Sequence, residues 1–442
     1  MSAAGAPLPD ADLLSAAFAA LLIPFAMVGL AAINAGLGRS RNAAHLMTAS
    51  LCVVAAAAIA YLSLGFAWQG AAGGPALVLY LGGKDWNWLA RQPLFLRGIA
   101  LSGSPVLLQA WVQLLCVGLT ALIPLGGAAE RWRLSAMCAS TALLAGFVFP
   151  LFGHWAWGGG WLEQLGTNYH LGHGFVDAGG SGTIHTMGGL AALAMTWLLG
   201  PRRGKYTSEG MPTAIPGHNG VQVLFGCFMA WVGWLGVNTA CSILFSGSGL
   251  GSAALIGLNT TLAAGSSGLV AAASTRVRFG RPDASLTANG WVAGLAAGSA
   301  GCAVVPPAAA ILIGIVAGFL APLVIEKLEL RLSIDDPGGA VSVHAVGGIW
   351  GLIAVGMFAR FSMGRFANDG NADSGQWVAQ LIGVATLAGF ILPLVYGLNW
   401  LLNRFVPHRV TPEGERQGLD LHELGAGAYP EFMTHTDEFF QR

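Results

Sequence analysis

Charged side chains are scarce in this 442-residue chain, because only 10% of its residues are Asp, Glu, Lys or Arg while 55% are hydrophobic. Soluble domains carry about 25% charged residues, so a water-exposed surface of ordinary composition is excluded. Acidic and basic residues balance at 21 each, which leaves no basic excess for binding nucleic acid. The composition therefore predicts an integral membrane protein.

Cysteine is also rare, and none of the six cysteines belongs to a CxxC pair. All lie in apolar stretches, where we expect small buried side chains rather than disulfides or metal ligands. The sequence lacks a nucleophile–base pair, a metal-binding cluster and a phosphate-binding loop, so we expect neither an enzyme nor a cofactor. His154, His170 and His173 could bind a metal, but we expect them to be solvated loop residues.

Long hydrophobic runs, by contrast, are abundant. A membrane-crossing helix needs about 20 apolar residues, and eleven stretches reach or nearly reach that length. They are residues 13–37, 48–68, 106–125, 134–157, 181–199, 221–245, 253–274, 288–305, 308–325, 341–359 and 377–402. The first stretch is too long for a cleaved signal peptide and lacks its basic leader, so we expect it to be retained. Residues 1–402 are thus predicted to form one transmembrane domain and residues 403–442 a cytoplasmic tail.

The distribution of basic residues supports this count of spans. Sixteen of the 21 Lys and Arg residues fall in every second loop and in the tail. The other five are Lys84, Arg91, Arg97, Arg360 and Arg365. Because Lys and Arg accumulate in cytoplasmic loops, we predict a cell-membrane protein with its N-terminus outside and its C-terminus inside. The 65 glycines suggest helices that pack closely through small faces.

One pattern occurs twice at identical offsets. The copies are Asp177-Ala-Gly-Gly-Ser-Gly-Thr-Ile-His185-Thr-Met-Gly-Gly189 and Asp336-Pro-Gly-Gly-Ala-Val-Ser-Val-His344-Ala-Val-Gly-Gly348. They open the fifth and tenth expected spans, and a shift of five spans reverses direction in the membrane. The predicted fold is therefore an all-α inverted repeat of five plus five helices with an extra eleventh helix, an architecture in which transporters place their site near the midplane.

The repeat places two histidines together. Eight helical residues rise about 12 Å, so His185 and His344, approaching from opposite sides, should both lie near the bilayer centre. A single membrane histidine is more often a packing residue, whereas two that converge predict a substrate or proton path. We expect neutral rings in a narrow apolar pore, with a hydrogen bond between them as one arrangement. Asp177 and Asp336 could be pore anions, but their places before a helix favour capping.

Several segments resemble the ammonium transporter/Rhesus protein family over almost the whole chain. They are Asp177 to His185 with Gly200-Pro-Arg after it, Ile215-Pro-Gly-His-Asn219, Gly233-Trp-Leu-Gly-Val-Asn238, Asp335-Asp-Pro-Gly-Gly-Ala-Val-Ser-Val-His344, and Glu415-Arg-Gln-Gly-Leu-Asp420 leading to Ala428-Tyr429. The resemblance implies an ammonium transporter that forms a homotrimer in the lipid bilayer, with one pore per subunit. It also implies a tail packed under the neighbouring subunit and a PII signalling protein as a possible partner.

The resemblance also assigns roles to individual residues. His185 and His344 match the pore histidine pair of the family, and Asp177 matches its outer aspartate. Trp157 matches the tryptophan of the outer recruitment site, where an indole face attracts a small cation by about 0.5 to 2 kcal/mol. The alternative for Trp157 is an interfacial anchor of the aromatic belt.

The chain departs from the family on the expected substrate path. The two phenylalanines that usually close the pore fall on Cys116 and Val237, and the serine that helps hold the cation falls on Cys241. A thiol is a weaker hydrogen-bond partner than a hydroxyl, so we expect weaker recruitment. We also expect a wider and wetter passage, unless Trp111 or Trp234 fills the gap.

In the tail, Leu424 and Ala426 replace a common histidine and glutamate, which argues against regulation through the tail.

These features predict that ammonium gathers near Trp157, loses its water and its proton there, and passes His185 and His344 as ammonia. Desolvation would drive the deprotonation, because a bare cation is costly in a low dielectric. One alternative is a sensor that binds ammonium with little conduction and signals through the tail. Another is a neutral-gas channel of the Rhesus type.

Overall fold

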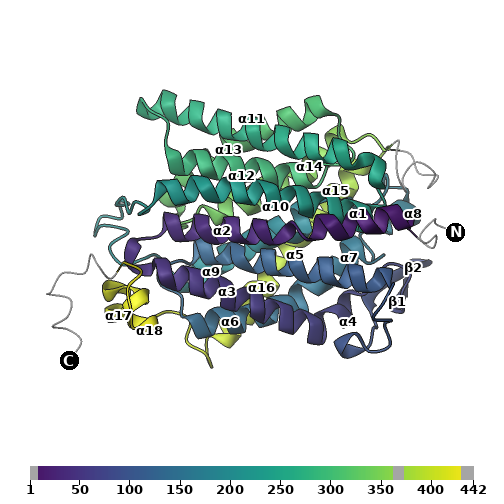
Figure 1. The fold of residues 1–442 in the computed structure, drawn as a ribbon, viewed down its shortest axis with the longest axis horizontal. Coiled ribbons are helices and arrows are strands. Elements are labelled where there is room, and N and C mark those ends of the chain that lie inside the picture. The colour runs from purple at the N-terminus through teal and green to yellow at the C-terminus, as the bar shows by residue number, and fades with distance from the viewer. Residues whose placement is uncertain (1–7, 362–372, 430–442) are drawn as a thin grey trace.

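The computed structural model describes residues 8–361 and 373–429. Long helices run side by side along one direction, with a β hairpin and the start of α1 at one end and the short helices α17 and α18 at the other (Figure 1). Arg365 and Arg442, two of the basic residues whose distribution predicts the orientation in the membrane, lie outside the described residues.

The helices are bounded as follows. They are α1 Asp10–Ala20, α2 Ile23–Leu37, α3 Ala43–Ala60, α4 Phe66–Gln69, α5 Pro105–Gly127, α6 Leu134–Leu143, α7 Phe149–Trp157, α8 Leu165–Tyr169, α9 Met187–Leu199, α10 Gly220–Ser246, α11 Ala253–Phe279, α12 Ala284–Ser299, α13 Pro307–Leu332, α14 Gly347–Phe358, α15 Gln376–Thr386, α16 Leu392–Leu402, α17 Pro412–Gln417 and α18 Leu419–Leu424. Five π-helical turns join some of them: η2 Tyr61–Gly65, η4 Leu144–Val148, η5 Ser181–Thr186, η7 Val341–Val346 and η9 Leu387–Ile391.

Nine helical segments of the described residues are long and apolar enough to cross a membrane. They are Asp10–Leu37, Ser40–Gln69, Pro105–Gly127, Leu134–Trp157, Gly220–Ser246, Leu250–Phe279, Pro307–Leu332, Val341–Phe358 and Gln376–Leu402. Each overlaps one predicted span. The other two predicted spans coincide with η5 plus α9 and with α12, which are also helical.

The prediction for residues 288–305 is wrong at its end, because α12 stops at Ser299 and turns follow. Side-chain and backbone N–H groups donate hydrogen bonds to carbonyl oxygens of this non-helical stretch, because buried backbone groups need partners. The Asn259 side chain donates to the carbonyls of Cys302 and Val305, both at 2.9 Å. The N–H of Ala178 donates to the Ala300 carbonyl at 3.0 Å. The unwound end of α12 is therefore held against the segment that leads into η5.

A β hairpin, which the sequence analysis did not predict, packs beside the C-terminal end of α7. Strand β1, Ala76–Leu81, pairs antiparallel with β2, Lys84–Ala90. Gly82 and Gly83 form the two-residue turn with φ of 61° and 74°, values that favour glycine. The Trp155 indole of α7 donates to the carbonyl of Trp88 in β2 at 2.8 Å.

The two copies of the sequence repeat contact each other reciprocally. Helix α9 contacts η7, and α14 contacts η5. The last glycine of each copy lies at these contacts. A Cβ at Gly189 would lie 2.2 Å from the Ala345 nitrogen, and one at Gly348 would lie 2.4 Å from the Ser181 carbonyl oxygen. Only glycine lets the two backbones approach this closely.

We predict that Gly189→Ala and Gly348→Ala each force the two helices apart. Overpacking of this kind costs about 1 to 3 kcal/mol of folding free energy. Thermal unfolding of the purified protein in detergent should show a lower midpoint for both variants. Gly265→Ala is the control, because open space surrounds that position on α11. Midpoints equal to that of the control would contradict the close contact.

Candidate functional site

Two histidines and a tryptophan form a stack in the middle of the molecule. The ring centroids of His185 and His344 are 5.5 Å apart, and those of His185 and Trp234 are 4.7 Å apart with planes inclined by only 13°. All three side chains are buried, at 0% exposure for His185 and Trp234 and 4% for His344. The repeat therefore brings together two imidazoles from η5 and η7, and Trp234 of α10 packs on them.

The histidine nitrogens lack protein partners among the described residues. Both ring nitrogens of His185 and the Nδ1 of His344 are buried without a hydrogen bond. A direct hydrogen bond between the two rings, which was one expectation, is thus absent here. Buried polar atoms in folded proteins are almost always paired with protein or water, so these nitrogens are positioned to meet a bound molecule.

One face of α10 leads from the histidines toward the end of the molecule that carries the hairpin. Trp234, Val237, Cys241 and Phe245 follow one another at spacings of three or four residues, which places them on one side of the helix. The rise from Trp234 to Phe245 is about 16 Å. This face contacts the histidine stack through Trp234 and Trp157 through Phe245.

Trp157 of α7 lies at the Phe245 end of this face. Its indole stacks on Phe245 with centroids 4.7 Å apart and planes 15° apart, and its N–H donates to the Asp177 carbonyl at 2.8 Å. Phe245 covers one face of the Trp157 indole, which is only 3% exposed. Sequence reasoning missed Phe245, although it lies one turn beyond Cys241.

The Asp177 carboxylate caps η5. Its Oδ2 accepts from the N–H groups of Gly182 and Thr183 and from the Thr183 hydroxyl at 2.8 to 3.0 Å. Burial raises the pKa of Asp177, although the bonds from Thr183 and Gly182 act in the opposite direction. Asp336 makes the equivalent contacts to Ala340 and Val341 at the start of η7. Both aspartates therefore sit where a helix needs an acceptor.

The two positions matched to the closing phenylalanines hold Cys116 and Val237, and Cys116 contacts Cys241, the position matched to the serine. The sulfurs of Cys116 and Cys241 are 3.5 Å apart, and both side chains are fully buried, as is that of Val237. Of the two tryptophans named as able to fill this gap, Trp234 stacks on His185. Trp111 instead is 37% exposed and lines an apolar groove between α1 and α5.

A small cavity lies next to His344 on the side away from Trp157. It is lined by Asn34, Asn289, Gly338 and His344, among others, and has a volume of about 10 Å³. That is room for about one water molecule. The two asparagines give it polar walls next to the second histidine.

The loop histidines behave differently from the prediction. His154 lies within α7, is 2% exposed, and its Nδ1 bonds to the Gln69 carbonyl at 2.8 Å. His173 is 6% exposed and lies 3.0 Å from an Asp373 oxygen. The expectation that these two are solvated is therefore wrong, because both pack against neighbouring segments. Within residues 8–361 and 373–429, no group of three or more His, Cys, Asp or Glu side chains is arranged to hold a metal.

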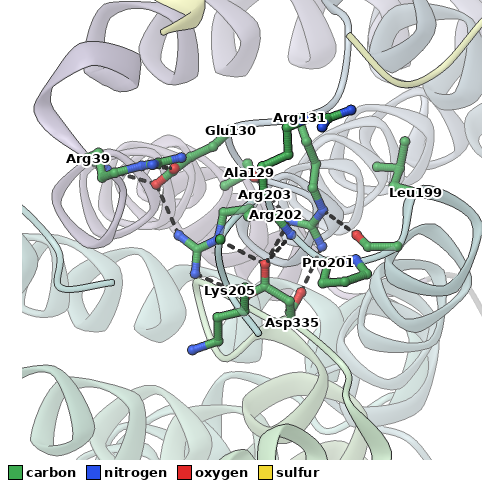
Figure 2. Close-up of polar contacts among 12 residues, drawn as sticks. Arg39, Ala129, Glu130, Arg131, Leu199, Pro201, Arg202, Arg203, Lys205 and Asp335 are labelled. Atoms are coloured by element: carbon green, nitrogen blue, oxygen red, sulfur yellow. Dashed lines mark hydrogen bonds and ion pairs between the residues drawn. The ribbon is translucent and has the colours of Figure 1, made fainter. Parts of the chain in front are cut away.

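A network of buried ions lies at the end of the molecule near α17 and α18. The Arg202 guanidinium pairs with Asp335 at 2.9 Å and with Glu130 at 3.1 Å, and Glu130 also pairs with Arg39 (Figure 2). Burial alone would raise the pKa of Asp335, but the hydrogen bonds and charge of Arg202 outweigh it and lower this pKa. Arg131 donates to three carbonyls, including that of Asp335 at 2.7 Å.

The C-terminal segment docks beside this network. The Glu415 carboxylate accepts from the Arg203 N–H at 2.6 Å and pairs with Arg409 at 2.9 Å. The Asp420 carboxylate accepts from the His45 N–H at 2.7 Å, at the start of α3. Glu423 accepts from the Leu134 N–H at 3.0 Å. The tail of the chain is therefore tied to α3 and α6 by its acidic residues.

Comparison with known proteins now identifies the family. A model described as the Ammonium Transporter Family matches residues 14–429. The chain belongs to the ammonium transporter family. It is thus a multi-pass membrane protein of a transporter and channel family. The family predicted from the sequence motifs is confirmed.

Individual ammonium transporters resemble the chain over most of their length. Ammonium transporter Amt2 of Archaeoglobus fulgidus is 37% identical over 433 residues, covering 96% of this chain and 89% of that protein. An ammonium transporter of Bacillus subtilis is 30% identical, covering 94% and 98%. A solved structure named Sensor Amt Protein superimposes with a TM-score of 0.82 at 29% identity, covering 94% of this chain and 98% of that one.

We predict that Asp335→Asn destabilises this ammonium transporter family member strongly. The substitution leaves Arg202 buried without its closest charged partner, and breaking a buried pair costs about 3 to 5 kcal/mol. Thermal unfolding at pH 7 measures the loss. At that pH the Asp335 carboxylate contributes fully, and its contribution is lost as the pH falls through its lowered pKa.

The matched control is Glu413→Gln. Glu413 pairs with Arg416, but their side chains are 69% and 71% exposed. Such a surface pair contributes less than about 1 kcal/mol. Equal effects of the two substitutions would contradict the importance of the buried network.

Proposed function

We propose that this chain carries ammonium or ammonia across the cell membrane through a pore lined by His185 and His344. The observation that carries the proposal is the pair of buried imidazoles without hydrogen-bond partners among the described residues. Ammonia is small enough for such a site and can both donate and accept a hydrogen bond. Membership of the ammonium transporter family supports the same substrate.

The route starts at Trp157 and Asp177 and passes Cys241, Cys116 and Val237. It continues past Trp234 and the two histidines to the cavity beside Asn34. Ammonium would lose its hydration at the outer end, where Trp157 and the nearby Asp177 favour a cation. A bare cation is costly in the apolar section that follows, so the proton separates before His185 and ammonia passes the stack. Transfer of the proton along the two imidazoles then makes the transport electrogenic.

The same proposal includes how the chain crosses the membrane. We propose eleven spans, made of the nine apolar segments with η5 plus α9 and α12, related as an inverted repeat with one extra helix. The reciprocal contacts of α9 with η7 and α14 with η5 support that repeat. The hairpin would face the outside and residues 403–442 would form the cytoplasmic tail of a single transmembrane domain. A homotrimer, with a PII signalling protein at the tail, is proposed from the resemblance.

A sensor is the second candidate function. The structural similarity to Sensor Amt Protein favours it. Phe245 supports it too, because its ring stacks on Trp157 and keeps the proposed route closely packed, which favours slow conduction. Currents evoked by ammonium on solid-supported membranes separate the two, since a sensor with little conduction gives none. Uptake without charge movement would instead indicate a Rhesus-type neutral-gas channel.

We predict that alanine at His185 and His344 abolishes ammonium transport or changes its selectivity. The imidazoles supply polar atoms in the apolar centre of the route, and alanine removes them. Ammonium-evoked currents from proteoliposomes, with methylammonium for comparison, measure both properties. His170→Ala is the control, because His170 is exposed and lies outside the route. Unchanged flux and selectivity in the double variant would refute the pore role.

We predict that Phe245→Leu strengthens the binding of ammonium. Leucine keeps an apolar side chain but uncovers the Trp157 face, where a cation gains about 0.5 to 2 kcal/mol. The ammonium concentration that gives half-maximal current should fall by about 2- to 30-fold. Phe228→Leu, at an exposed position of the same helix, is the control. An unchanged or higher half-maximal concentration in Phe245→Leu would argue against the covering role.

A further inference from the structure

Two cysteine sulfurs lie in contact in the interior of the molecule. Cys116 of α5 and Cys241 of α10 place their Sγ atoms 3.5 Å apart, and both residues are 0% exposed. They are 125 positions apart in the chain, so the fold and not local sequence brings them together. Each sulfur has the other as its hydrogen-bond partner.

Other buried thiols contact oxygen instead. The Cys302 sulfur lies 3.3 Å from the Ser242 hydroxyl, and that of Cys227 lies 3.8 Å from the Ala288 carbonyl. Both of those contacts leave the sulfur without a second thiol to react with. The pair of Cys116 and Cys241 is therefore chemically distinct from its neighbours.

The pair lies on the proposed route of ammonia, one turn of α10 from Phe245 and two turns from Trp234. In the proposed orientation this is the outer half of the membrane, next to a compartment in which disulfides persist. A route that admits ammonia also admits hydrogen peroxide, which is small, neutral and able to form hydrogen bonds. Larger oxidants would be excluded by the stacked rings of Trp157 and Phe245.

We propose that Cys116 and Cys241 form a reversible oxidation site for hydrogen peroxide. One thiol sulfur attacks a peroxide oxygen, the O–O bond breaks, and the proton of that thiol passes to the leaving oxygen, which departs as water. The resulting sulfenic acid is then attacked by the second sulfur, so that the S–S bond forms and a second water leaves with the remaining proton. Two thiols lose two electrons in total, and one peroxide is reduced to two waters.

The disulfide shortens the sulfur separation from 3.5 Å to about 2.0 Å. It ties α5 to α10 across the route and removes both thiol hydrogens. The route becomes narrower and more rigid between Trp157 and His185. Both the access of peroxide to the thiols and this effect on flux rest on the proposed function, whereas the contact between the two sulfurs does not.

Mass spectrometry of the full-length protein in lipid nanodiscs tests the oxidation directly. After treatment with hydrogen peroxide, the peptides that contain Cys116 and Cys241 should appear cross-linked, with two hydrogens lost, and should separate after reduction. Oxidation of the exposed Met211 shows that the peroxide has acted. Absence of the cross-link in protein whose Met211 is oxidised would overturn the proposal.

Ammonium-evoked currents test the consequence in proteoliposomes. Peroxide should lower the current of the unmodified protein several-fold, and a phosphine reductant should restore it. Cys116→Ser and Cys241→Ser should each abolish this sensitivity, while the control Cys227→Ser should keep it. A cross-link that forms without any loss of current would leave the oxidation site intact but would count against the proposed route.

Discussion

The structure depends on bringing two helix backbones close enough for their imidazoles to share one site. Gly189 contacts the turn that carries His344, and Gly348 contacts the turn that carries His185. Any larger side chain at either glycine would hold the histidine turns apart, because the neighbouring atoms are backbone and cannot move aside. The reciprocity of these contacts explains why the glycines recur with the histidines in both copies of the repeat.

Several polar side chains near this contact bond to backbone groups that helix ends leave unpaired. The capping aspartates satisfy the first N–H groups of η5 and η7, and Asn259 satisfies carbonyls at the unwound end of α12. The histidine nitrogens are left without protein partners among the described residues. The donors and acceptors that cap these backbone groups are therefore paired, and the imidazole nitrogens lie on the proposed route, where a substrate can bond to them.

Much of this could be predicted from the sequence. The helical spans follow from hydrophobic length, and the histidine pair follows from the repeated spacing of His185 and His344. Both signals are local or periodic, so one sequence is enough to find them. The match of the chain to the ammonium transporter family confirms the recognition that these motifs allowed.

Other features depend on partners far away in the chain. Phe245 covers Trp157 only because α10 turns that face toward α7, and the thiol contact needs two helices to meet. The partners of Arg202 come from two separate loops. The hairpin could have been predicted, because Gly82-Gly83 between two short segments is a known turn signal. A search for long hydrophobic runs does not detect it. The position at which α12 ends depends on the hydrogen bonds from Asn259 to the residues that follow it, and hydropathy along the sequence does not predict such bonds.

The ion network also bears on how solute could move. Arg202 joins Glu130, which follows α5, to Asp335, which precedes η7, so one guanidinium ties together the two parts of the chain that the proposed repeat would relate (Figure 2). Rocking of one half against the other would have to part these buried charges, at a cost far above thermal energy. The clamp therefore favours a stationary scaffold through which a small molecule diffuses past rearranging side chains, and disfavours an alternating-access cycle.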